Sequence, residues 1–354
     1  MIPSLFNTGL MGKPSSVGGG AAVGGWKEVG RTTLGSNGQN ITVSSIPDKR
    51  YYMIIGNVEL TNGATGGGSR LGSSSIDTGS NYASRQSVDG GADSTSTSQT
   101  RQHVVGAYTG APEFYITYIS NLSTKEKLGL TWKNYGFTGV SNAPKRMESA
   151  HKWTNTSNPL DIVNYYQGGS DNFTSGDEVV VLGWDPDDTH TTNFWGELAN
   201  VSSTSTISSI ESGVFTSKKY LWVQAWCDTT TAANWAMRLG NTTLDTGSNY
   251  SNRRSINGAG DATATSQTKG HLEDSGGGLV GPMFLNAFII NNASNEKLCI
   301  FNTVFPSTAG AGTAPNRIEG VFKWANTSNQ ADILSVGTFS QTFTKSELRV
   351  WGSD

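Results

Sequence analysis

The sequence has little charge, few cysteines and no long apolar run. Charged residues make up 15% of its 354 residues, where about a quarter is usual, and the net charge is −3. It therefore has no basic surface for nucleic acid. No run approaches the roughly 18 apolar residues of a membrane span, and the first residues lack the basic segment and apolar core of a signal peptide. We expect neither a nucleic-acid nor a membrane partner, and we do not interpret the Asn-x-Ser/Thr triplets as glycan sites.

The chain also has few residues of the kinds that bind metals. Its two cysteines, Cys227 and Cys299, lie in apolar runs and are expected to be buried thiols, because a disulfide or metal site needs more partners. His103 and His271 have no His or Cys three to five residues away, so we expect them in solvent-facing loops. The sequence predicts no metal and no cofactor.

The common catalytic motifs are missing as well. The sequence has no Walker loop, no Gly-x-Ser-x-Gly elbow and no His-Glu-x-x-His. The paired carboxylates of glycosidases cannot be judged from sequence, because their separation depends on the tertiary structure. We therefore expect a protein that is not an enzyme, and keep a glycan-active enzyme only as a minor alternative.

The residues that are abundant indicate an ordered protein of short strands and many turns. The sequence has 44 glycines and is rich in Ser, Thr and Asn, while 10 Trp, 11 Tyr and 13 Phe supply the apolar anchors that disordered chains lack. No stretch has a sustained 3.6-residue apolar period with caps, so almost no helix is expected.

The chain repeats itself at about half its length. DTGSNYASRQSVDGGADSTSTSQT, residues 77–100, returns as DTGSNYSNRRSINGAGDATATSQT at 245–268 with 15 of 24 positions identical, a shift of 245 − 77 = 168 residues. Such a period is typical of two copies of one domain. Matching aromatic and β-branched runs predict strands in both copies. These strands are 51–60, 114–119, 127–132 and 178–184 in the first copy, and 220–226, 284–290, 297–301 and 347–351 in the second.

These strands predict an all-β protein with two tandem antiparallel β-sandwich domains, jelly-roll-like in topology, from an internal duplication. We place a flexible N-terminal arm at residues 1–25, the first domain at 26–187 and the second at 188–354. The arm has a glycine-rich tether and an apolar head that could pack on the body or on a neighbouring subunit, and we favour the neighbour. The residues expected to make these assembly contacts are Leu5, Phe6, Leu10 and Met11.

One set of polar residues recurs in the repeated stretch. It consists of Asp77, Tyr82, Arg85 and Asp93 in the first copy and Asp245, Tyr250, Arg253 and Asp261 in the second. A hard cation takes carboxylate and carbonyl oxygens, but this spacing is not that of an EF-hand loop. We favour a structural motif of Asp–Arg pairs and Asx turns that fixes a long loop or edge strand, with a bound cation or a ligand contact as alternatives.

A second shared segment contains a tryptophan. Trp153 and Trp324 each precede a polar x-Asn-Thr-Ser-Asn run, in a Lys-Trp pair. We favour a core position with the indole N–H satisfied, and keep a glycan contact as the alternative, since aromatic rings can serve as platforms for sugars.

The chain resembles virion structural proteins of tailed bacteriophages, particularly those of marine and freshwater phages. The resemblance rests on the opening Trp26-Lys-Glu-Val-Gly-Arg-Thr-Thr-Leu34, on the repeated Asp-Thr-Gly-Ser-Asn-Tyr-x-x-Arg motif and on the Ser-Gln-Thr runs that follow it. It covers nearly all of both copies. The second copy departs from it at its opening, where Trp195-Gly-Glu-Leu lacks the Gly-Arg-Thr-Thr.

The resemblance implies a non-enzymatic virion protein of the capsid shell or capsid surface, such as a minor or decoration protein. Its partners would be other virion proteins and copies of itself, in a trimer or larger ring that covers the sandwich edges. The alternative is a tail or fibre protein that binds a host-surface glycan.

Overall fold

The computed structural model describes residues 25–61, 67–102, 110–190, 192–273, 279–306, 311–339 and 341–354. Within these ranges the chain contains only strands, turns and bends, and every strand pairing is antiparallel. The predicted all-β class and the antiparallel sandwich are therefore confirmed. The arm residues Leu5, Phe6, Leu10 and Met11 lie outside the described ranges.

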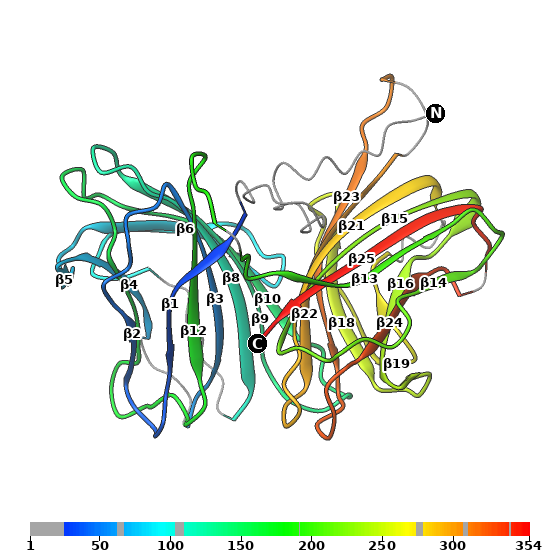
Figure 1. Cartoon of the computed structure of the whole chain (residues 1–354), viewed down its shortest axis with the longest axis horizontal. Helices are drawn as coiled ribbons and strands as arrows, with labels where there is room; N and C mark the ends of the chain where they lie inside the picture. Colours follow the sequence, from blue (N-terminus) through cyan, green and yellow to red (C-terminus); the bar gives the residue numbers. More distant parts are fainter. Residues whose placement is uncertain are drawn as a thin grey trace.

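The first half of the chain forms an eight-stranded and a four-stranded sheet (Figure 1). In spatial order the large sheet contains β1 (Lys27–Thr33), β12 (Glu178–Trp184), β3 (Tyr51–Glu59), β8 (Pro112–Ser120), β9 (Lys127–Tyr135), β10 (Lys145–Trp153), β6 (Tyr82–Val88) and β7 (Ser94–Gln99). The small sheet contains β2 (Asn40–Val43), β11 (Ile162–Tyr166), β4 (Gly68–Ser73) and β5 (Ser75–Ile76).

The second half has the same strand order. Its eight-stranded sheet contains β13 (Gly196–Ser203), β25 (Lys345–Ser353), β15 (Tyr220–Ala233), β21 (Leu279–Ile290), β22 (Lys297–Phe305), β23 (Asn316–Trp324), β18 (Tyr250–Ile256) and β19 (Ala262–Gln267). The smaller sheet contains β14 (Ser209–Glu211), β24 (Ile333–Gly337), β16 (Ala236–Asn241) and β17 (Thr243–Leu244), and β20 (Gly270–His271) also pairs with β16. The origin of the two halves by duplication stays a prediction from the sequence.

Each sandwich has a core between its two sheets, and a third core joins the sandwiches. Alternate residues of β12 show the division, since Val179 and Val181 face the first sandwich core whereas Val180 and Leu182 face the second half. In the second half Trp222, Phe288 and Ile300 face back toward the first. Inner strands such as β3 and β12 are therefore buried on both faces, which explains the continuous apolar run of Val179, Val180, Val181 and Leu182.

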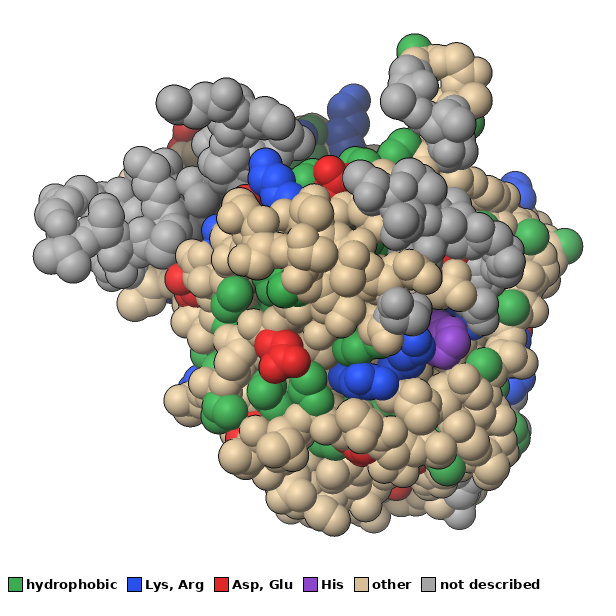
Figure 2. All heavy atoms as spheres, turned by 90° about the vertical axis from the view of Figure 1, so that its right-hand side faces the viewer, with side chains coloured by type: hydrophobic (Ala, Val, Ile, Leu, Met, Phe, Trp, Pro, Cys, Tyr) green, Lys and Arg blue, Asp and Glu red, His purple; other side chains and the backbone are tan. Residues whose placement is uncertain are grey.

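The ends of the molecule's long axis are occupied by the small sheets, with the large sheets meeting in the middle (Figure 1). In the space-filling view, the outward end of the second half shows mainly uncharged polar side chains, with scattered apolar ones and no broad apolar area (Figure 2). This matches the low charge of the sequence.

Candidate functional site

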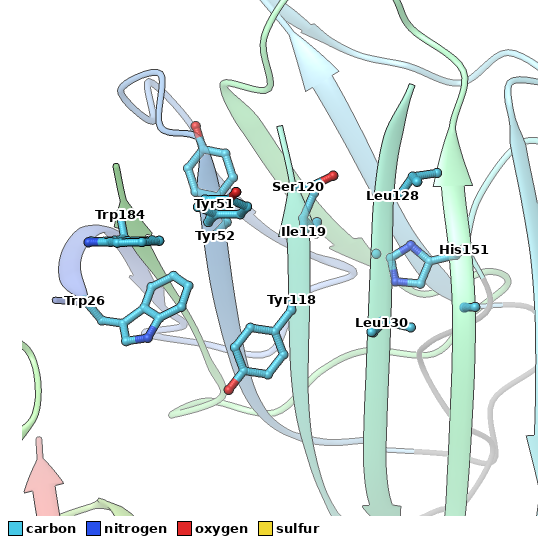
Figure 3. A pocket seen from close by; sticks show the side chains of 12 residues that line it. Trp26, Tyr51, Tyr52, Tyr118, Ile119, Ser120, Leu128, Leu130, His151 and Trp184 are labelled. Carbon is cyan, nitrogen blue, oxygen red and sulfur yellow. The ribbon is translucent and has the colours of Figure 1, made fainter. Parts of the chain in front are cut away.

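An apolar groove crosses the outer face of the first large sheet. It has a volume of about 690 Å³ and is lined by residues of β3, β8, β9 and β10, by the end of β12 and by Trp26, which precedes β1. Its main ring and aliphatic side chains are Trp26, Tyr51, Tyr118, Leu128, Leu130 and Trp184. Figure 3 shows the aromatic side chains on one side and the two leucines on the next strand.

The aromatic wall of the groove is a chain of ring contacts. Trp184 stacks on Tyr51 at 5.3 Å between centroids and lies 6.4 Å from Trp26, which in turn lies 6.0 Å from Tyr118. These rings are half-buried, and burial raises the pKa of the Tyr118 hydroxyl far above its usual value. The wall is thus a preformed apolar surface whose rings support one another.

The opposite wall consists of leucines that point away from the sandwich core. On β9 the side chains of Lys127 and Thr131 face the interior, so Leu128 and Leu130 face outward and are 55% and 49% exposed. They stand next to each other on the same face of one strand. Leucines so exposed beside aromatic rings form a contiguous apolar patch of the kind that marks an interaction site.

Behind β9 the interior of the first sandwich is polar. Lys133 pairs with Glu113 at 2.8 Å, with both side chains almost fully buried. Thr131 contacts the Thr117 hydroxyl at 2.8 Å and His151 Nε2 at 3.0 Å. Burial lowers the pKa of His151 to about 4, so the ring is neutral at pH 7. These groups are enclosed between the sheets and serve the structure rather than a substrate.

The recurring Asp–Tyr pair holds a turn in each half. Asp77 accepts hydrogen bonds from Gly79 N at 2.8 Å and from Asn81, and Tyr82 Oη donates to the carbonyls of Asp77 and Leu71. Partial burial would raise the pKa of the Asp77 carboxyl, but the bonds from Trp153, Asn81 and Gly79 hold it below its usual range.

The second half repeats this arrangement. Asp245 accepts from Gly247 N at 2.7 Å and from Asn249 at 2.8 Å, and Tyr250 Oη donates to Leu239 O at 2.8 Å. In both halves, protein N–H groups thus donate to the carboxylate oxygens of the recurring aspartate. In the described part of the chain no group of three or more His, Cys, Asp or Glu is arranged to hold a metal ion.

The Arg and Asp members of the motif differ between the halves. Arg85 and Asp93 form an exposed pair at 3.5 Å, with Asp93 on the turn before the edge strand β7. Asp261 is instead buried and is held by Arg146 of the first half, while Arg253 donates to Pro144 O at 2.8 Å. In the second half, therefore, this pair belongs to the contact between the sandwiches.

The two tryptophans do not provide a glycan platform. Trp153 and Trp324 are each 1% exposed, and their Nε1 atoms donate to Asp77 and Asp245 at 2.7 Å. Stacking on a sugar needs an accessible ring face, so the glycan-contact alternative for these two residues is wrong. Each ring closes its sandwich core instead.

The groove residues were not singled out from sequence. Trp26 was identified only as the opening of the first copy and residues 127–132 only as a strand, because a period-two pattern does not say which row faces outward. The signal in the sequence is the polar row Lys127, Gly129 and Thr131, which alternates with Leu128 and Leu130. A row of that composition contributes little apolar surface to a sandwich core.

Comparisons with known proteins show no family. No family model matches the chain, and no curated protein matches it. Among solved structures, domains LG4-5 of the mouse laminin alpha1 chain match with 10% sequence identity over 95% of this chain and 90% of that one, at a TM-score of 0.20. Among the described residues, no helix has the length and apolar character to cross a membrane.

Proposed function

We propose that the chain is a non-enzymatic structural subunit of a tailed-phage particle, in the capsid shell or on its surface, that assembles through its sandwich faces and N-terminal arm. The observation that carries the proposal is the open apolar face at Leu128 and Leu130. A soluble protein that leaves such a face beside four aromatic rings has a surface suited to a protein partner. The assignment to a phage particle rests on the sequence resemblance.

The neutral polar surface supports the same proposal. Copies that meet through many weak contacts gain stability from multivalency, and low charge limits repulsion between neighbours. The mostly uncharged end of the second half, seen in Figure 2, suits such packing.

Cryo-electron microscopy of purified particles from the source sample tests this function. Hundreds of copies on an icosahedral lattice would support a shell or decoration subunit, whereas a few copies at one vertex would place the chain in the tail. Its absence from purified particles would overturn the proposal. A chain lacking residues 1–25 should fail to be incorporated, while one with Glu211→Arg on the outer strand β14 should be incorporated normally.

A second candidate is glycan binding by a tail or fibre protein, which the four rings of the groove favour. Tryptophan and tyrosine faces stack on sugar rings, and Trp26, Tyr51, Tyr118 and Trp184 line one wall. Binding to a glycan array that is lost in Trp184→Ala and retained in Trp226→Ala, outside the groove, would support it. No binding by the intact chain would exclude it.

A further inference from the structure

In the second half, the face that corresponds to the groove is covered by the first half. Leu298 and Ile300 occupy on β22 the register positions that Leu128 and Leu130 occupy on β9. They are only 3% and 4% exposed, because the first half packs on them. The same position is thus a core contact in one half and an open surface in the other.

The charged residues around this face are likewise buried in the second half and exposed in the first. Lys323 and Glu296 form a buried pair at 3.1 Å, capped by first-half backbone groups: Lys323 Nζ donates to Phe137 O at 2.6 Å, and Gly139 N donates to Glu296 at 2.7 Å. Their counterparts Lys152 and Glu126 form the same pair, also at 3.1 Å, in the open.

The first half covers this face with apolar residues of β3, β8 and β12, and its β9–β10 end makes the polar contacts. Arg146 Nη2 donates to Asp261 Oδ1 at 2.7 Å, and its Nε lies within 3.0 Å of both carboxylate oxygens. Arg253 donates to Pro144 O, and Asn134 donates to Cys299 O and Phe322 O at 2.9 Å. The contact therefore joins the far end of β9 and β10 in one sandwich to the near end of β22 and β23 in the other.

The second half has the corresponding end, and the arginine there, Arg317, is exposed. Arg317 occupies the register position of Arg146, and each arginine lies two residues after a proline, Pro315 or Pro144. The Arg317 side chain pairs with Glu319 and is 59% exposed. Asn257 also accepts from Arg317 N at 3.0 Å, as Asp89 accepts from Arg146 N. The far ends of β22 and β23 project from the body at the top of Figure 1.

We propose that a second copy of this chain covers the groove by repeating the contact that the chain makes within itself. The Arg317 end of one copy docks on the Leu128–Leu130 face of the next. Arg317 then pairs with Asp93 as Arg146 pairs with Asp261, and Arg85 donates to the neighbour's Pro315 carbonyl. Such a contact is heterologous, so copies add head to tail into a ring or an open filament. The inference rests on the proposed structural function.

Charge reversal tests the pairing in the full-length chain. We expect concentration-dependent association of the wild-type protein by sedimentation velocity, and a loss of affinity of roughly 100-fold in Asp93→Arg and in Arg317→Asp alone. The double variant Asp93→Arg/Arg317→Asp should recover association, because the reversed charges meet between copies. Glu211→Arg, a charge reversal on β14, should leave association unchanged.

Three results would overturn the inference. These are a wild-type chain that stays monomeric at high concentration, single variants that associate as the wild type does, and a double variant no better than either single one. Glycan captured by a strictly monomeric chain would assign the groove to a sugar instead. Circular dichroism melts of each variant check that the fold is retained.

The outcome is separable from that of the proposed function. Particles that contain the chain although Asp93→Arg does not affect its association would leave the structural function standing and remove the head-to-tail contact. If association follows the charge pattern but the chain is absent from particles, the head-to-tail contact stands and the structural function is removed.

Discussion

Strands β9 and β22 occupy the same place in two sandwiches of the same strand order, yet β22 buries both of its rows of side chains over its first residues and β9 leaves part of its outward row exposed. On β22 both rows are buried, with Cys299 and Phe301 in the sandwich core and Leu298 and Ile300 under the first half. On β9 the inward row contains Thr131 and Lys133, and the outward leucines are exposed. What packs on the outside of the sandwich, rather than the position of the strand in the fold, decides whether the outward row is buried.

The two interiors differ in a related way. Glu113 and Lys133 of the first sandwich correspond by register to Met283 and Thr303 of the second, and His151 corresponds to Phe322. The first sandwich therefore holds a buried ion pair and a neutral histidine where the second holds only uncharged side chains, a methionine, a threonine and a phenylalanine. Such a pair stabilises the fold less than apolar packing does, but it is costly to break.

The largest loss of stability is expected from breaking the buried ion pair between Lys133 and Glu113. Lys133→Thr removes the ammonium that lies 2.8 Å from Glu113 and should lower the free energy of unfolding by about 4–5 kcal/mol. The double variant Glu113→Met/Lys133→Thr places the residues of the second sandwich in the first and should recover most of the loss. Urea unfolding measures both. A double variant no more stable than Lys133→Thr would contradict the comparison.

Much of the fold could be predicted from the sequence, whereas the groove could not. Aromatic and β-branched runs predicted β3, β8, β12 and their counterparts, because those residues fill pleated surfaces wherever they occur. The exposure of Leu128 depends on how the two sandwiches are offset, since the equivalent Leu298 is covered, and that offset is a tertiary property that no local pattern contains. Trp153 is a second position that the sequence left open, because its polar neighbours are compatible with an exposed ring. In the structure the indole N–H is satisfied internally, by a hydrogen bond to Asp77.

A smaller loss is expected at the junction between the halves. Asp261→Ala leaves the buried Arg146 without the carboxylate that it contacts at 2.7 Å and should cost about 3–4 kcal/mol. Asp93→Ala removes the equivalent carboxylate from an exposed pair and should leave the unfolding midpoint nearly unchanged. Differential scanning calorimetry separates the two. Equal shifts would show that the junction does not depend on this ion pair.

The third effect depends on pH. Burial lowers the pKa of His151 to about 4 from the usual value of about 6.5, so between these values the unfolded chain binds a proton that the folded chain does not. Stability from this group should therefore fall as pH decreases from about 6.5 to about 4, by up to about 3 kcal/mol.

His151→Phe, which copies Phe322, should remove that contribution. Burial also raises the pKa of Asp177, to about 7, and this group acts in the opposite direction as the pH falls, so the informative quantity is the difference between the wild type and His151→Phe. Urea midpoints at several pH values measure it, and a difference that does not vary with pH would contradict the assignment.

The smallest effect is expected at the exposed leucine. Leu130→Ser removes an apolar side chain that is 49% exposed, so in dilute solution the free energy of unfolding should change by less than about 0.5 kcal/mol. Ile300→Ser, at the matching position under the first half, should cost about 3 kcal/mol, because it leaves a cavity and a hydroxyl in an apolar contact. At high protein concentration the head-to-tail contact should bury Leu130 as the first half buries Ile300, and Leu130→Ser should then weaken association. If thermal melts instead give the two serine variants the same loss in dilute solution, the leucine is already covered within one chain.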